Sequence, residues 1–99
     1  MTDAELRVLL QDCVVLWNVD ARAVASPEGI EVIAGNAALL VQRAPADMRP
    51  VRWLLHSPDR VASGRPPRAV PSIVALLAAL RNALGADGGN RLRIGGSAP

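Results

Sequence analysis

The feature that most constrains the fold is a pair of apolar runs separated by a Gly-Asn dipeptide. Residues 30–41 read Ile-Glu-Val-Ile-Ala-Gly-Asn-Ala-Ala-Leu-Leu-Val. Gly35 and Asn36 suit a two-residue primed turn, because such turns require positive φ and these two residue types tolerate it. Apolar and β-branched residues bounded by a turn signal are typical of strands. The sequence therefore predicts a tight β-hairpin.

A two-residue turn also fixes which residues of the hairpin face each other. Ala34 is expected opposite Ala37, and alternation then gathers four large apolar residues on one side: Ile30, Val32, Leu39 and Val41. The other side is mixed, with expected pairs of Glu31 with Leu40, Ile33 with Ala38, and Gly29 with Gln42, and it could meet either water or a partner. A lone hairpin is only marginally stable in water. The rest of the chain must therefore cover the apolar side.

The segment before the hairpin is expected to form a helix and a strand. Thr2 and Glu5 have the spacing of a capping box at a helix start, and Asn18 is suited to a left-handed helix end. A helix is expected over Asp3–Trp17, with an apolar stripe at three- and four-residue spacing made of Leu6, Leu9, Leu10, Cys13, Leu16 and Trp17. Arg22–Ala25 should be the first strand, and Ser26-Pro27-Glu28-Gly29 the turn into the hairpin.

The segment after the hairpin is expected to supply one more strand and a second helix. Residues 44–50 contain Pro45 and Pro50 and indicate a loop, whereas Val51–His56 alternates as a half-buried strand does. Residues 57–70 contain three prolines and are interpreted as a loop. A helix should begin at Pro71 or Ser72 and end at Gly85, with Ile73, Leu76, Leu77, Leu80 and Leu84 on its apolar side.

Together these elements predict an α+β domain. We expect two layers, in which an antiparallel four-stranded meander carries the N-terminal and the C-terminal helix on one face, in the order α-β-β-β-β-α. Residues 1–85 should form this single domain, and the Gly-rich residues 86–99 a mobile tail, unless Arg91–Ile94 adds an edge strand. Apolar residues make up 51% of the chain without any Phe or Tyr, so the core should be aliphatic around Trp17 and Trp53.

Composition excludes several classes of protein. The longest apolar run, Ile73–Leu80, is far shorter than the roughly 20 residues that span a bilayer. Asp3 and Glu5 stand where a secretory signal would be basic, so we expect a cytoplasmic protein without a membrane partner. The single cysteine, Cys13, permits no intrachain disulfide and no multi-cysteine zinc site. Neither a cofactor nor a metal is expected. All basic residues are Arg, which is typical of GC-rich bacterial coding.

Catalysis would have to involve Cys13 and His56, the obvious nucleophile and base of the chain. Cys13 belongs to the apolar stripe of the first helix, which should pack on the sheet face that holds Trp53. His56 alternates to the opposite face. We therefore assign no catalytic residues, and we do not expect an enzyme.

Charge is unevenly distributed along the chain. Residues 1–42 hold six carboxylates and two arginines, whereas residues 43–68 hold six arginines and two carboxylates. A basic segment of this kind can bind nucleic acid or another anion, and mutual neutralisation of the two segments is the simpler interpretation. A sharper alternative places an anion at the start of the second helix, where Arg65, Arg68 and Ser72 would meet free N–H groups. No Gly-rich phosphate loop supports it.

The second helix indicates association with another protein. Its residues Val74, Ala75, Ala78 and Ala79 flank the leucine stripe, so that the helix is apolar on nearly every side. Helices of this type are normally buried all round, although exposed Ala is also common and harmless. The leading hypothesis is a small interaction or accessory protein that forms a homodimer or docks on a larger protein, and the alternative is an anion- or nucleic-acid-binding module that uses segment 43–68.

Overall fold

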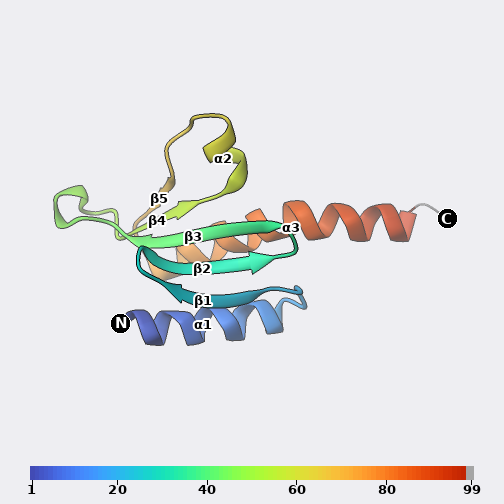
Figure 1. The fold of residues 1–99 in the computed structure, drawn as a ribbon, viewed down its shortest axis with the longest axis horizontal. Coiled ribbons are helices and arrows are strands. Elements are labelled where there is room, and N and C mark those ends of the chain that lie inside the picture. Colours follow the sequence, from blue (N-terminus) through green and yellow to red (C-terminus); the bar gives the residue numbers. More distant parts are fainter. Residues whose placement is uncertain (98–99) are drawn as a thin grey trace.

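An antiparallel sheet carries two helices on one of its faces in the computed structural model (Figure 1). The structure describes the backbone of residues 1–97 and the side chains of residues 1–85. In chain order the elements are α1 (Asp3–Leu16), β1 (Arg22–Ser26), β2 (Gly29–Ala34), β3 (Ala37–Arg43), the short 3₁₀ helix η1 (Ala46–Met48), β4 (Trp53–His56), α2 (Pro58–Ala62), β5 (Arg68–Val70) and α3 (Ile73–Ser97). The predicted α+β class is confirmed, with five strands in place of four.

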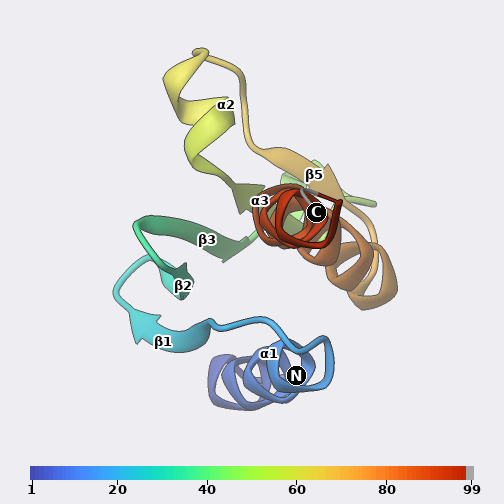
Figure 2. The same ribbon diagram turned by 90° about the vertical axis from the view of Figure 1, so that its right-hand side faces the viewer.

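The sheet is a simple meander in which each strand pairs with the next one along the chain. Figure 2 shows the sheet curving around the two long helices, both of which lie on its concave side. Helix α1 contacts β1 and β2, and α3 contacts β4 and β5. The two helices therefore divide one face of the sheet between them, as expected for a two-layer domain.

The central hairpin has the predicted register. Ala34 pairs with Ala37, and the four large apolar residues of the two strands face the helices as expected. Gly35 has a φ of 60°, whereas Asn36 is not among the residues with positive φ, which is the pattern of a II′ turn with glycine first. The turn chemistry and the apolar alternation thus agree on one register.

Helix α1 begins and ends with the predicted signals. The Thr2 hydroxyl accepts a hydrogen bond from the Glu5 N–H at 3.1 Å, and the Glu5 carboxylate accepts one from the Thr2 N–H at 2.8 Å. Asn18 follows the helix with a φ of 59°. The predicted stripe is wrong in two places: Cys13 is only half-buried and Leu16 is 82% exposed, whereas the fully buried residues are Leu6, Leu10 and Val14. The helix is rotated slightly relative to the prediction, so that Val14 belongs to its buried side.

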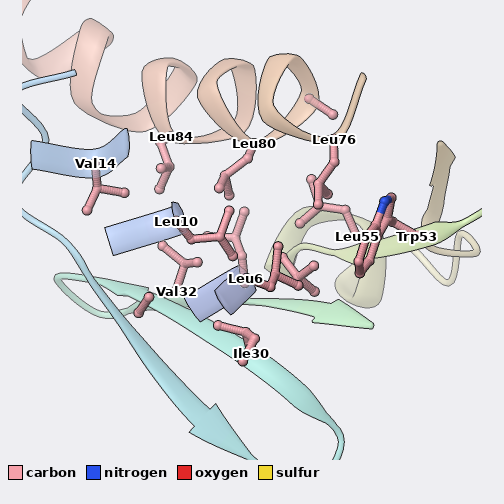
Figure 3. Close-up of a cluster of buried hydrophobic side chains, with 14 of the residues drawn as sticks. Leu6, Leu10, Val14, Ile30, Val32, Trp53, Leu55, Leu76, Leu80 and Leu84 are labelled. Carbon is pink, nitrogen blue, oxygen red and sulfur yellow. The ribbon is translucent and has the colours of Figure 1, made fainter. Parts of the chain in front are cut away.

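The core lies between the sheet and the two long helices (Figure 3). In the figure, Leu6 and Leu10 of α1 approach Leu80 of α3 above the strands. The largest fully buried side chains are Leu6, Leu10, Ile30, Leu39, Leu76, Leu80, Val14, Val32 and Val41. Burying a side chain of this size contributes about 1.5–3 kcal/mol. The core is therefore aliphatic, with Trp53 at one end of it.

The segment from Ser57 to Val70 is more ordered than predicted. Pro58 opens the short helix α2, and Arg68–Val70 pairs with β4 as a fifth strand, with Val70 opposite Trp53. The sequence predicts a loop here because three residues between prolines have almost no local strand signal. Their pairing with β4 is a tertiary effect. Prolines on both sides are compatible with an edge strand, where one row of N–H groups is unpaired.

Helix α3 continues past its predicted end. It runs from Ile73 to Ser97, so Gly85 does not terminate it, and Arg91–Ile94 lies in a helix and not in an edge strand. A glycine inside a helix costs only about 1 kcal/mol relative to Ala, which is too little to end a helix by itself. The proposed division into a domain of residues 1–85 and a tail of residues 86–99 stays a prediction. None of the helices in the described chain has the length and apolar character needed to cross a membrane.

Candidate interaction surface

The face of the sheet that points away from α1 and α3 is here called the outer face. It consists of the strand residues that alternate with the buried ones: Arg22, Val24, Glu31, Ile33, Ala38, Leu40, Gln42, Leu54, His56 and Ala69. Figure 2 shows that no described helix lies across this side of β1, β2 and β3, and that α2 only approaches β3 at one margin. The outer face is therefore open over most of the sheet.

Each of the three central strands has large apolar residues on both faces. In each of them two large apolar residues follow one another, so that one faces the helices and the other faces outward: Val32 and Ile33 in β2, Leu39 and Leu40 in β3, and Leu55 and Leu54 in β4. Antiparallel strands with one solvated face usually alternate between apolar and polar residues, whereas near-continuous apolar runs are typical of strands covered on both sides. The described chain covers only one side.

Polar groups on the outer face are few, and two of them are already paired. A ring nitrogen of His56 lies 2.7 Å from the side-chain oxygen of Gln42, so the imidazole N–H donates to the amide oxygen. Glu31 and Arg22 are the only residues of opposite formal charge on this face. Strand register places Val24, Glu31, Leu40 and His56 in one row across four strands. This row has a carboxylate on β2 and an imidazole on β4, with Leu40 between them.

The free edge of β1 is partly closed by the chain itself. The Gln11 side-chain oxygen accepts a hydrogen bond from the Ala23 N–H at 2.9 Å, so a donor of the edge strand is satisfied from α1. An edge with unpaired N–H groups invites pairing with another chain, and covering it prevents that contact. The outer face is therefore better suited than the β1 edge to contact another protein.

The predicted flank of the second long helix is only partly exposed. Val74 is 73% exposed and Ala78 is exposed, whereas Ala75 is half-buried and Ala79 is only 5% exposed. Ala79 belongs to the core cluster, so its assignment to an interaction flank is corrected. The helix is rotated so that its small residues approach the sheet, and the exposed apolar surface shrinks to two residues. This flank is too small to be the main contact.

The residues predicted to bind an anion do not converge on one point. Arg65 donates to the Ser63 hydroxyl at 3.0 Å, and Ser72 caps α3 by accepting from the Ala75 N–H at 3.1 Å. Arg68 lies in β5 and lines a hollow of about 200 Å³ together with Arg60. The arginines of segment 43–68 are thus divided among several places, and Arg43, Arg49 and Arg52 gather elsewhere, beside the first residues of α3.

Cys13 and His56 lie on opposite sides of the sheet, as the alternation predicted. Burial of the Cys13 thiol raises its pKa, and the negative charge of Asp12 raises this pKa further. The thiol is therefore less ionised at neutral pH than a free cysteine, which is unlike an activated nucleophile. The described residues also contain no group of three or more His, Cys, Asp or Glu side chains that could hold a metal ion.

The sequence predicts the outer face only in part. The hairpin pattern places Ile33 and Leu40 on a mixed side that could meet water or a partner, and the main contact is expected on the second helix instead. Placing β4 beside β3 adds Leu54 to Leu40 and Ile33, and this step needs the tertiary arrangement. No known protein family, curated protein or solved structure matches the chain.

Proposed function

We propose that this chain is a protein-interaction module that forms a homodimer through the outer face of its sheet. The observation that carries the proposal is that β2, β3 and β4 each place a large apolar residue on the open outer face, namely Ile33, Leu40 and Leu54. Apolar surface removed from water contributes roughly 25 cal/mol per Å², so an open face of this kind favours association. The homodimer predicted from the sequence is kept, and its contact moves from the helix flank to the sheet.

Strand register supports a second copy as the occupant. If a two-fold axis runs along β3 between two stacked sheets, β2 of one copy lies over β4 of the other. Glu31 of each copy then faces His56 of the other copy, because both residues share a row with Leu40. Leu40 meets its own equivalent at the axis, as a self-complementary two-fold contact requires. The same operation brings an acid to a base and apolar residues to apolar residues.

The size of the outer face is compatible with a weak dimer. The sheet has five strands, and its longest strand, β3, has seven residues. With strands about 4.8 Å apart and a rise of about 3.3 Å per residue, the area is at most on the order of 500 Å² per copy. The convex curvature of this face centres the contact on the middle strands. Standard interfaces bury about 800 Å² per partner. We therefore expect self-association in the micromolar range.

The proposal is tested by changing half-buried Leu40 on the outer face and exposed residues on other surfaces. Leu40→Glu places a charge at the proposed axis, and burying an unpaired charge costs several kcal/mol. Leu16→Glu is the matched control, because Leu16 is 82% exposed at the end of α1 and lies away from the sheet face. Ala78→Glu tests the flank of α3. The molar mass of each protein is measured by light scattering after size exclusion at about 100 μM, where micromolar association is visible, and circular dichroism verifies folding.

We expect a dimeric wild type, a monomeric and folded Leu40→Glu variant, and dimeric Leu16→Glu and Ala78→Glu variants. A wild type that is monomeric at this concentration would contradict self-association and leave a different protein as the partner. A dimer that is lost in Ala78→Glu but retained in Leu40→Glu would return the contact to α3.

A further inference from the structure

A second site lies on the helix side of the sheet, at the first residues of α3. A hollow of about 1220 Å³ is lined there by the η1 loop, by the start of β4 and by the residues that lead into α3. Three arginines belong to its wall: Arg43, Arg49 and Arg52. The hollow is distinct from the outer face, because Trp53, which also lines it, points toward the core (Figure 3). The outer-face dimer therefore neither requires it nor closes it.

The start of α3 supplies unpaired N–H donors to this hollow. Ser72 accepts the hydrogen bond of the Ala75 N–H and thereby caps one of the first amides. The N–H groups of Ile73 and Val74 have no partner among the hydrogen bonds of the described residues, and the first turn of a helix cannot satisfy them internally. Ser72 and Ile73 both line the hollow. The positive end of the helix dipole adds to the attraction for an anion.

Trp53 supplies an independent observation at this hollow. Its side chain is 5% exposed. Its indole nitrogen is buried and has no hydrogen-bond partner among the described residues. In Figure 3 the nitrogen lies on the edge of the ring that is turned toward α3. The indole N–H can only donate, so what it lacks is an acceptor. Leaving such a donor unpaired costs about 1–3 kcal/mol.

Charge in the hollow is strongly positive. Asp3 neutralises Arg43 through an ion pair of 3.0 Å, and the guanidinium of Arg43 lies 4.9 Å from the centre of the Trp53 ring. Arg49 and Arg52 have no carboxylate partner among the described side chains. Two free cations, two helix amides and one indole N–H exceed what the two oxygens and single charge of a carboxylate can use. A phosphate group carries three free oxygens and nearly two charges at neutral pH.

We propose that this hollow binds the phosphate group of a small phosphate ester. The phosphate lies at the first turn of α3, where the amides of Ile73 and Val74 and the side chain of Arg52 hold it and the indole N–H of Trp53 gains its acceptor. The apolar wall formed by Ala44, Pro45 and Val51 receives the body of the ester. Ligand pockets usually measure about 300–1,000 Å³, so the hollow has room for a whole small molecule.

The test follows the two indole N–H signals of the full chain by ¹H–¹⁵N NMR during titration with inorganic phosphate. Sodium chloride keeps the ionic strength constant, and acetate is titrated separately. We expect saturable shifts of the Trp53 indole and of the Ile73 and Val74 amides, with no shift of the Trp17 indole. Phosphate should bind at least about tenfold more tightly than acetate. Phosphate affinity should fall at least about tenfold in Arg52→Gln and should not change in Arg22→Gln, the matched control on the outer face.

A second variant separates loss of the site from loss of the fold. Trp53→Phe keeps the buried ring but removes the unpaired donor, and the Ile73 and Val74 amides then report binding. A reduced affinity in a folded Trp53→Phe protein supports the proposal. Shifts that do not saturate, an equal shift of the Trp17 indole, equal affinities for acetate and phosphate, or an unchanged affinity in Arg52→Gln would each overturn it.

Discussion

At the scale of single residues, two glycines of the sheet have positive φ for different reasons. Gly35 has a φ of 60° at the hairpin turn, and a Cβ built there would have no atom within 4 Å. Gly29 has a φ of 155° at the start of β2, and a Cβ built there would collide with the backbone carbonyl oxygen of Val41. Only Gly29 is therefore required both for its conformation and for the space it leaves to the neighbouring strand.

This difference predicts unequal costs for the same substitution. Gly35→Ala should lower the free energy of unfolding by about 1–3 kcal/mol, the cost of holding an L-residue at the positive φ that the first position of a II′ turn requires. Gly29→Ala should cost clearly more, because the pairing of β2 with β3 must also shift to relieve the collision. Urea unfolding followed by tryptophan fluorescence measures both values. Equal costs, or a larger cost at Gly35, would contradict the close approach at Gly29.

At the scale of elements, the start of α1 should depend on pH. The hydrogen bond from the Thr2 backbone N–H lowers the pKa of Glu5, and the Thr2 side chain lowers it further. A carboxyl group whose pKa is lower in the folded state stabilises the fold above its unfolded pKa, and this contribution is lost as the pH falls through its folded pKa. Glu5→Gln should therefore be less stable than wild type at neutral pH.

The measurement is urea unfolding of wild type and Glu5→Gln at several pH values from 7 to 3. The difference in the free energy of unfolding should shrink as the pH falls and the Glu5 carboxyl group is protonated. The same measurement on an Asp3→Asn variant serves as the comparison. Asp3 also lies in the first turn of α1, but it contacts Arg43 and not the capping residue. A difference that stays constant over this range would mean that the capping box does not act through the Glu5 charge.

The elements that could be predicted are those whose signals are local. The capping box at Thr2, the left-handed residue Asn18 and the Gly35 turn each specify a boundary within a few residues, and all three are confirmed. Strand β5 could not be predicted in this way, because Arg68–Val70 is a strand only through its pairing with β4. The rotation of α3 was also out of reach. The packing of α3 on β4 and β5 decides which of its small residues is buried, and in the fold this residue is Ala79.

At the scale of the whole molecule, two helices cover one face of a five-stranded sheet and leave the other face open. The sequence was sufficient to predict this layering, because each helix has a stripe of large apolar residues and the hairpin has one register that gathers its large apolar residues on one side. It was not sufficient to locate the contact surface, since the paired apolar residues of β4 join those of β2 and β3 only after the sheet is assembled. The same limit applies to the hollow beside α3, whose arginines come together only in the fold.

The central claim is that copies of this chain meet through the outer face, and contacts between copies can be observed directly. A mixture of ¹³C-labelled and unlabelled protein at concentrations above the dissociation constant gives isotope-filtered nuclear Overhauser effects between the two copies only. We predict such effects from the methyl groups of Leu40, Leu54 and Ile33, with those of Leu40 strongest. Effects confined to the exposed methyl groups of Val74 and Ala78, or to Val8 and Val15 on α1, in a protein of dimeric mass would contradict the account.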